Sequence, residues 1–343
     1  MSQSGSFLAS RNDGLGARLI PILSALRLGD EIGVPVRIHW PVIVDMNHNT
    51  AEYERLFDAA FIDKHFIDAE AFRRLNAQAV AIETALDATT AELGASVRRG
   101  DIYVFANPMR KTRLNTEDAD KFSARFSRAF SLISFTSEVR DRMEEIDRAF
   151  AGRRCIAYHV RHGDLTRHYR TRGKPWTAKY IPNEIYLSHM EAEPDQGQTV
   201  RIVFGDCPQS LDWLKARHCD LLRIGDLVSL DGLGSLQRDF LELYAMSRAG
   251  RIIAPRSSGF SQMAAAIGQA QVVDIMEDLN EKQIAEAFGN LARRLRDRRD
   301  SFTNDGDVAQ SLAHLVPHLA ANGDDREART LIDSEIDAGN TVA

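Results

Sequence analysis

Cysteine is scarce in this chain, and long apolar runs are missing from it. The 343 residues include three cysteines, Cys155, Cys207 and Cys219, with no Cys-x-x-Cys pair among them. A disulfide framework or a zinc site built on paired cysteines is therefore not expected. No apolar run approaches the roughly 20 residues of a membrane-spanning helix, and the first residues lack the pattern of a signal peptide. We therefore expect a cytoplasmic protein without a membrane span.

A basic surface is missing as well. The chain has 43 lysines and arginines against 49 aspartates and glutamates, a formal net charge of −6. This balance argues against nucleic acid as a partner. Hydrophobic residues make up 44% and charged residues 27%, as in a well-packed globular enzyme. The length is that of two α/β domains.

The first 150 residues predict an irregular α/β domain. Apolar residues at helical spacing predict a helix over 18–33, and the alternation of Val36, Ile38 and Trp40 predicts a strand after it. Helical stretches around 50–60 and 68–98, a strand over 102–105 and a helix over 134–150 complete this half. We assign residues 1–150 to an N-terminal Rossmann-like domain.

Strands and helices alternate more regularly in residues 151–300. The predicted strands cover 155–160, 201–205, 221–224, 251–255 and 271–276. The predicted helices cover 182–190, 208–218, 234–248 and 279–299, with one more beginning after Gly259. This rhythm indicates a second Rossmann-like domain, with a parallel sheet covered on both faces. Residues 301–343 predict a helical hairpin packed on the body, with a flexible tail or the start of a helical repeat as alternatives.

A cluster of polar residues follows the first strand of the second half. His159, Arg161, His162 and Asp164 lie within six positions at its carboxyl end, the edge of a parallel sheet at which ligands bind. Arg161 is the residue type that suits a diphosphate, because its planar guanidinium binds oxygens in pairs. The alternative is an ordinary strand end with a surface ion pair between Arg161 and Asp164.

A second cluster lies between the strand over 251–255 and the next helix. Ser257, Ser258 and Gly259 form a small-residue turn that leads into a helix N-terminus. Free backbone N–H groups and the positive end of the helix dipole favour an anion there. The alternative is that one serine only caps the helix.

Three further features are weaker. Asp206 follows the strand over 201–205 and could contact a ligand or only cap the next helix. Asp239 and Glu242 lie on the helix over 234–248 and could point toward the ligand site or face solvent. Gly14 and Gly16 form a glycine loop before the first helix. An NAD site there is not expected, because a third glycine at the dinucleotide spacing and a preceding strand are missing.

These segments resemble the GDP-fucose-dependent fucosyltransferase superfamily, which includes α1,2-, α1,6- and protein O-fucosyltransferases. Residues 159–164, HVRHGD, are similar to its His-x-Arg-Arg-x-Asp signature and are closest in motif to the rhizobial nodulation-factor α1,6-fucosyltransferase. Residues 239–268 resemble its third motif, and residues 14–33 resemble its N-terminal glycine loop and first helix.

The resemblance implies a fold of the GT-B type, in which two Rossmann-like domains face each other. It implies an inverting transfer with GDP-fucose as the donor substrate, no cofactor and no metal. The second domain would bind the donor and the first the acceptor, a glycan or another hydroxyl compound. The implied roles are phosphate contacts for Arg161, Ser257 and Ser258, a nucleoside contact for His159 and reading of the base for Glu242, and Asp164 matches the signature's last acid. We also assign His162, Asp206 and Gly259 to the donor site. A general base should activate the acceptor hydroxyl, for which Asp164 is the first candidate, with Asp13 and His162 as alternatives.

The sequence departs from the family pattern at three positions. Ala17 stands where many members have asparagine, Glu242 replaces aspartate, and His162 replaces the second arginine. Two other functions stay open, the first because of Ala17 and the second because of the alternation of strands and helices. One is a catalytically inactive protein that binds a nucleotide sugar, and the other is an NAD(P)-dependent oxidoreductase with its cofactor at the N-terminal loop.

Overall fold

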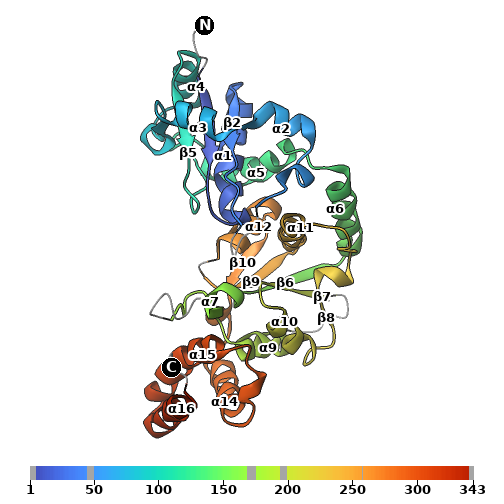
Figure 1. The fold of residues 1–343 in the computed structure, drawn as a ribbon, viewed down its shortest axis with the longest axis vertical. Helices are drawn as coiled ribbons and strands as arrows, with labels where there is room; N and C mark the ends of the chain where they lie inside the picture. Colours follow the sequence, from blue (N-terminus) through green and yellow to red (C-terminus); the bar gives the residue numbers. More distant parts are fainter. Residues whose placement is uncertain (1–4, 45–49, 168–174, 194–198, 257, 340–343) are drawn as a thin grey trace. The chain divides into compact units, whose positions relative to one another are not determined.

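The chain divides into two compact units, each built on a parallel sheet (Figure 1). The computed structural model describes residues 5–44, 50–167, 175–193, 199–256 and 258–339. The first unit comprises residues 1–149, 228–248 and 259–270, and the second comprises residues 150–227, 249–258 and 271–343. The α/β class and the two parallel sheets agree with the prediction. The domain bounds differ, because two helices within 151–300 group with the first unit.

The first unit has a five-stranded sheet in the order β3-β2-β1-β5-β4, with every neighbouring pair parallel. The strands are β1 (Ser6–Ser10), β2 (Val36–His39), β3 (Phe66–Ile67), β4 (Val80–Ala81) and β5 (Ile102–Phe105). The central strand β1 pairs with both β2 and β5 and has Phe7, Leu8 and Ala9 completely buried. The expectation that no strand precedes the glycine loop was therefore wrong, since β1 ends just before it.

Helix α1 (Leu15–Ile32) starts three residues earlier than predicted, so that Gly14 is its N-cap and Gly16 lies in its first turn. It ends at Gly33, whose φ of 73° places it in the left-handed region, and whose N–H donates to the Gly29 carbonyl. This is a common way to end a helix, and glycine adopts it without a Cβ clash. Most of α1 is buried, including all its leucines, so this helix forms the centre of the unit.

The other helices of the first unit are shorter. They are η1 (Tyr53–Arg55), α2 (Ala59–His65), α3 (Ala69–Asn76), η2 (Ile82–Ala85), α4 (Thr90–Arg98), α5 (Ala119–Arg128), η3 (Ala129–Leu132), α6 (Ser137–Phe150), α11 (Ser235–Ser247) and α12 (Gly259–Gly268). Helix α12 packs against α1, α5 and α11. The predicted helical stretch over 68–98 is interrupted by β4, because residues 80 and 81 pair with β5.

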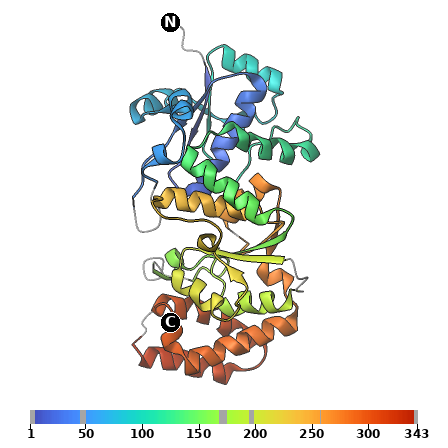
Figure 2. The same cartoon turned by 90° about the vertical axis from the view of Figure 1, so that its right-hand side faces the viewer.

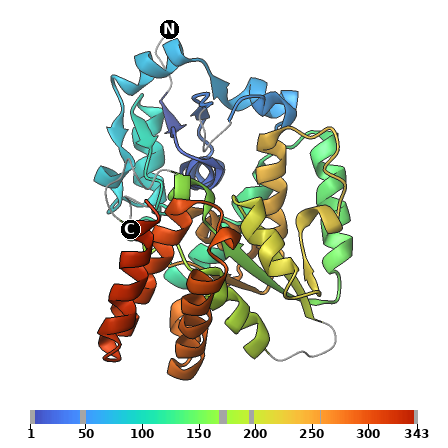
Figure 3. The same ribbon diagram turned by 60° about the horizontal axis from the view of Figure 1, so that its bottom comes forward.

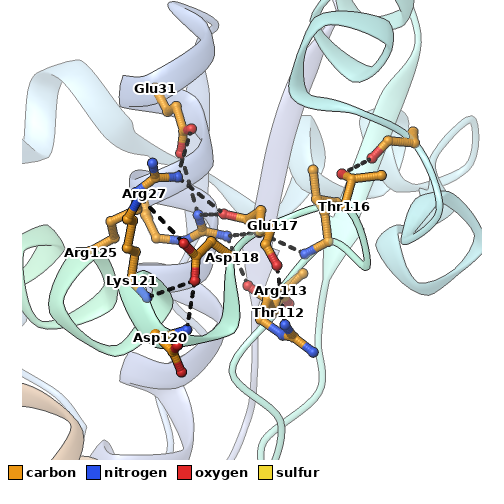
Figure 4. A network of polar contacts seen from close by, with 12 residues as sticks. Arg27, Glu31, Thr112, Arg113, Thr116, Glu117, Asp118, Asp120, Lys121 and Arg125 are labelled. Atoms are coloured by element: carbon orange, nitrogen blue, oxygen red, sulfur yellow. Dashed lines mark hydrogen bonds and ion pairs between the residues drawn. The ribbon is translucent and has the colours of Figure 1, made fainter.

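A buried ion pair ties α1 to the segment between β5 and α5 (Figure 4). Arg27 and Glu117 are each only 4% exposed at the side chain and are joined by two hydrogen bonds. Arg27 also donates to the Thr112 carbonyl at 3.0 Å, and Glu117 accepts from the Leu114 N–H at 2.7 Å. These contacts give both buried charges hydrogen-bond partners in the chain.

The second unit has a five-stranded parallel sheet in the order β10-β9-β6-β7-β8. The strands are β6 (Arg154–Val160), β7 (Thr199–Gly205), β8 (Leu221–Leu222), β9 (Arg251–Ala254) and β10 (Gln271–Asp274). From β6 the chain builds the sheet first toward β7 and β8 and then on the other side toward β9 and β10. The order reverses between β6 and β9, which is where open α/β sheets bind ligands beyond their carboxyl ends.

The helices of the second unit include the C-terminal residues. They are α7 (Gly163–Arg167), α9 (Asn183–Ala192), α10 (Pro208–Lys215), η4 (Ile224–Asp226), α13 (Ile275–Asp278), α14 (Glu281–Asp297), η5 (Arg299–Ser301), α15 (Asp305–Ala321) and α16 (Asp325–Asp337). Helix α15 packs against α7, α14 and α16. The C-terminal helices α14, α15 and α16 lie side by side (Figures 2 and 3). The predicted helical hairpin is confirmed. No helix in the described ranges is long and apolar enough to span a membrane.

Candidate functional site

Arg161 is held by a forked ion pair at the carboxyl end of β6. Its Nε donates to Asp164 Oδ1 at 3.2 Å, and its Nη2 donates to Oδ2 at 2.9 Å. The Arg161 side chain is 24% exposed and that of Asp164 is 9% exposed, so this is not a simple surface pair. Burial disfavours the Arg161 charge, but Asp164 and the charge of Asp206 outweigh it and raise the Arg161 pKa. The guanidinium therefore stays charged while keeping some access to a ligand.

Asp164 has a different role in this structure from the predicted one of a general base. Both of its carboxylate oxygens accept hydrogen bonds from Arg161. A carboxylate engaged with a guanidinium in this way is poorly suited to accept a proton from an acceptor hydroxyl. We therefore expect Asp164 to orient Arg161 and not to act as the general base.

Asp206 caps the short helix α7. Its Oδ1 accepts from the N–H groups of His162 and Gly163, each at 2.8 Å, and its Oδ2 accepts from the Asp164 N–H at 3.3 Å. The prediction gave it a donor contact or a cap on the helix that follows it. Helix α10 instead has Cys207 at its N-cap, without a side-chain hydrogen bond. The Asp206 carboxylate therefore satisfies the N–H groups at the start of α7 and leaves the Arg161 side chain to Asp164.

Gly163 makes this cap possible. A Cβ atom on this residue would lie 2.4 Å from the Asp206 carbonyl oxygen. That distance is too short for any side chain, so the approach of α7 to the end of β7 requires glycine.

The donor contact predicted for His162 does not fit the structure. The residue is 1% exposed, and its Nδ1 and Nε2 lie 2.8 Å from Ser210 Oγ and 2.7 Å from the Ile181 carbonyl oxygen. The ring stacks on Tyr180 with the centroids 4.3 Å apart. Burial is the main cause that lowers its pKa. His162 therefore belongs to the core of the second unit.

His159 and Ser258 join the two strands at which the sheet order reverses. His159 lies near the end of β6, Ser258 follows β9, and the His159 Nδ1 lies 3.1 Å from the Ser258 Oγ. Burial, reinforced by the positive charge of Arg161 and opposed by Asp206, lowers the His159 pKa to about 4. The imidazole is therefore neutral at pH 7. These two residues are brought to the same sheet edge as Arg161, as predicted, and Ser257 lies outside the described residues.

The glycine loop and the N-terminus of α12 meet within the first unit. Gly14 is the N-cap of α1, and a Cβ on Gly16 would lie 3.0 Å from the Cα of Phe260. Gly16 therefore lets α1 pack closely against the first turn of α12, which begins at Gly259. Glu242 lies half-buried on α11 in the same unit, and its contact with a base stays a prediction.

Arg18 is a residue that the sequence analysis missed. It is 1% exposed, its Nε donates to the Asp13 carbonyl at 2.5 Å, and its guanidinium lies over the Trp40 ring, 4.7 Å from the centroid. Burial lowers its pKa to about 10, against the opposing charge of Asp13. The available signal was an arginine among the small and apolar residues of the first turn of α1. Among the described residues, no group of three or more His, Cys, Asp or Glu side chains could hold a metal ion.

Comparison with known proteins gives structural neighbours only. No protein-family model matches the chain, and no curated protein matches it in sequence. The structure is similar to POFUT1 in complex with GDP, at 11% identity over 79% of this chain and 99% of that chain, with a TM-score of 0.44. It is also similar to the fucosyltransferase NodZ from Bradyrhizobium, at 17% identity over 76% of this chain and 92% of that chain, with a TM-score of 0.46.

A second NodZ structure, co-crystallized with GDP, matches at 16% identity over 76% of this chain and 91% of that chain, with a TM-score of 0.44. NodZ is described there as an alpha-1,6-fucosyltransferase, the class of enzyme that residues 159–164 resemble. A likeness at this level carries no function, so we infer the function from the site's own residues.

Proposed function

We propose that this chain is an inverting glycosyltransferase that transfers fucose from GDP-fucose to a hydroxyl group of a glycan or another acceptor. The observation that carries the proposal is the forked Arg161–Asp164 pair at the carboxyl end of β6, where the sheet order reverses. A permanently charged, oriented guanidinium at this edge suits a nucleoside diphosphate. The resemblance of residues 159–164 to the fucosyltransferase signature supports guanine and fucose as the finer assignment.

In the proposed step the acceptor hydroxyl oxygen forms a bond to the sugar C1 and gives up its proton to a base, while GDP departs with the electrons of its bond to C1. As the bond between the sugar C1 and the phosphate oxygen breaks, negative charge grows on the departing diphosphate. Arg161 is already oriented by Asp164, so it stabilises that charge without reorganising. Loss of such a preorganised contact typically raises the barrier by about 3–4 kcal/mol. Asp206 and Gly163 support this arrangement indirectly, by fixing the start of α7.

His159 and Ser258 complete the donor side of the proposal. The hydrogen bond between them fixes the ends of β6 and β9 at the same edge. We assign His159 and Ser258 to contacts with the nucleoside and the phosphates, respectively.

The first test is calorimetric titration with GDP, GDP-fucose, UDP and NAD. We expect GDP and GDP-fucose to bind the wild type, and Arg161→Ala to weaken GDP binding about a hundredfold, because two charge-assisted hydrogen bonds are lost. Arg161→Lys should lie between the two, since lysine keeps the charge but lacks the fork. Arg154→Ala is the matched control, since Arg154 lies at the opposite end of β6 and pairs with Glu193.

Each outcome has a defined meaning. Preference for UDP would keep a glycosyltransferase and refute the fucosyl assignment, whereas binding of NAD alone would favour the oxidoreductase. Absence of nucleotide binding would refute the proposal. Release of GDP from GDP-fucose, stimulated by an acceptor, would distinguish transfer from simple binding.

A further inference from the structure

Arg18 has a buried charge whose outer nitrogens lack hydrogen-bond partners among the described residues. Its Nη1 and Nη2 atoms are buried and make no hydrogen bond to a described residue, in keeping with an exposure of 1% for the whole residue. A buried charge left without partners is strongly destabilising, and native proteins hydrogen-bond nearly all their buried polar groups. The missing partner is therefore a feature that calls for a ligand.

The nearest carboxylate does not fill this need. Asp13 contributes only its backbone carbonyl to Arg18, through the Nε atom. The Asp13 carboxylate instead pairs with Arg11, with the Arg11 Nε 2.5 Å from the Asp13 Oδ2. The Asp13 charge therefore offsets the burial of Arg18 only in part, and Nη1 and Nη2 keep no hydrogen-bond partner among the described residues.

The surroundings of Arg18 favour an oxyanion. The residue lies in the first turn of α1, an 18-residue helix whose N-cap, Gly14, provides no side-chain cap. The helix dipole and the free N–H groups at this end attract negative charge. Hydrogen bonding of the Arg18 Nε to the Asp13 carbonyl directs the guanidinium back toward this end of the helix.

Trp40 contacts the face of the Arg18 guanidinium and does not use the N–H groups at its edge, which such a ligand needs. The indole ring covers one face of Arg18 and is itself fixed by a hydrogen bond from its Nε1 to the Thr50 carbonyl at 2.9 Å. The guanidinium N–H groups point outward in its plane, so stacking on the face does not consume them. Ser10 and His39, paired at 3.0 Å at the ends of β1 and β2, add polar groups at the same sheet edge.

We infer that Arg18, Trp40 and the N-terminus of α1 form a binding site for an oxyanion, a carboxylate or phosphate group carried by the acceptor. The substrate class would then be an acidic glycan or a phosphorylated acceptor. Assignment of the anion to the acceptor rests on the proposed function, whereas anion binding by Arg18 does not. The two can therefore fail separately.

The test uses the full-length Arg161→Ala protein, in which the proposed diphosphate contact has been removed. Thermal unfolding is followed with inorganic phosphate, D-glucuronate or neutral D-glucose. We expect a saturable rise in Tm of about 2 °C or more with phosphate, glucuronate or both, and no rise with glucose. The responding anion identifies the group: glucuronate alone indicates a carboxylate, and phosphate alone indicates a phosphorylated acceptor.

The variant Arg18→Met in the same background should abolish the rise. Without ligand it should be at least as stable as its parent, because an apolar side chain replaces a buried charge whose Nη1 and Nη2 make no hydrogen bond. Arg18→Lys keeps a charge without the fork and should retain part of the rise. An unchanged anion response in Arg18→Met, an equal response to glucose, or no response to either anion in the parent would overturn the inference.

Weakened GDP binding would also count against the inference. If Arg18→Met in the otherwise native protein weakens GDP as much as Arg161→Ala does, Arg18 belongs to the donor and not to the acceptor. Normal GDP binding together with a lost anion response supports the inference. An Arg18-dependent anion response in a protein that binds no GDP would leave the anion site in place and remove only the proposed transferase function.

Discussion

At the scale of single residues, His159 shows how burial sets a charge state at the candidate site. The ring is 7% exposed and lies close enough to Arg161 for its positive charge to disfavour protonation. The lowered pKa of about 4 keeps the imidazole neutral over the physiological range. Protonation of His159 would place a second positive charge beside Arg161 in a buried environment, which the fold resists.

This charge state predicts how stability depends on pH. Above pH 6.5 His159 is neutral in both the folded and the unfolded chain, so it has no effect. Between pH 6.5 and about 4 only the unfolded chain binds the proton, so the free energy of unfolding falls as the pH falls. The contribution of one such histidine reaches about 1.4 kcal/mol per pH unit.

Urea unfolding at pH 7, 6 and 5 tests this dependence. His159→Gln should lose less stability than the wild type as the pH falls, because glutamine does not titrate. Carboxylates and the other histidines titrate in both proteins and cancel in the comparison. Parallel pH profiles for the two proteins would show that His159 is not held neutral by the fold.

The residue scale also shows which site assignments a sequence can support. The place of Arg161 was predictable, because strand alternation and the chemistry of arginine are both local properties. The roles of His162 and Asp206 were not, because His162 contacts Ser210, 48 positions away, and Asp206 caps a helix 43 positions before it. Whether a histidine belongs to the core or contacts a ligand depends on neighbours that are distant in sequence and come together only in the fold.

At the scale of elements, the link between α1 and the segment after β5 rests on the Arg27–Glu117 pair (Figure 4). Glu117→Ala should lower the free energy of unfolding by about 3–5 kcal/mol, because it leaves Arg27 charged and buried. The contact of Arg27 with Glu31, at 3.4 Å, offsets only part of this loss, since Glu31 is 32% exposed. Denaturant unfolding measures the change.

The matched control removes both charges. Arg27→Met combined with Glu117→Met should recover most of the stability, because an apolar pair carries no desolvation cost. With the single variants Arg27→Met and Glu117→Met, a double-mutant cycle then gives the interaction energy between the two residues. A loss below about 0.5 kcal/mol for Glu117→Ala would instead be typical of a surface position and would contradict this role.

Elements also differ in how well the sequence predicts them. The strands β6, β7 and β9 were found because their apolar runs are bounded by turn residues. Strand β1, with the sequence SFLAS, was missed because serines flank its short apolar centre, although it is the central strand of its sheet. Strand β4 exists because it pairs with β5, a contact with no local signature.

At the scale of the whole chain, the units are assembled from separated segments. Helices α11 and α12 group with the first unit, although they alternate in sequence with strands of the second. The strand–helix rhythm predicted the class of fold correctly, because that rhythm is the same wherever a helix packs. It could not assign α11 and α12 to a unit, because that depends on contacts such as those of α12 with α1.

The C-terminal helices are part of the core of the second unit. Val308, Leu312 and Leu315 of α15 belong to one apolar cluster with residues of β6 and α9. The Tyr180 hydroxyl, which is completely buried, lies 2.8 Å from the Ser311 Oγ. A Cβ on Gly306 would meet the Thr166 carbonyl oxygen of α7 at 2.0 Å, so α15 approaches α7 without room for a side chain.

This packing predicts that the second unit depends on α15 for its stability. Leu315 is completely buried, so Leu315→Ala should cost about 2–5 kcal/mol through lost burial and the cavity left behind. Ile336 of α16 is 57% exposed, so Ile336→Ala is a matched control expected to change stability by less than about 0.5 kcal/mol. Urea unfolding followed by circular dichroism compares the two variants. If both behave like the wild type, α15 is an appendage and the second unit folds without it. A selective loss in Leu315→Ala would show that the second unit needs α15, which lies in the last forty residues of the chain. Because α15 packs against α7, the position of Asp164 beside Arg161 would then depend on this helix as well.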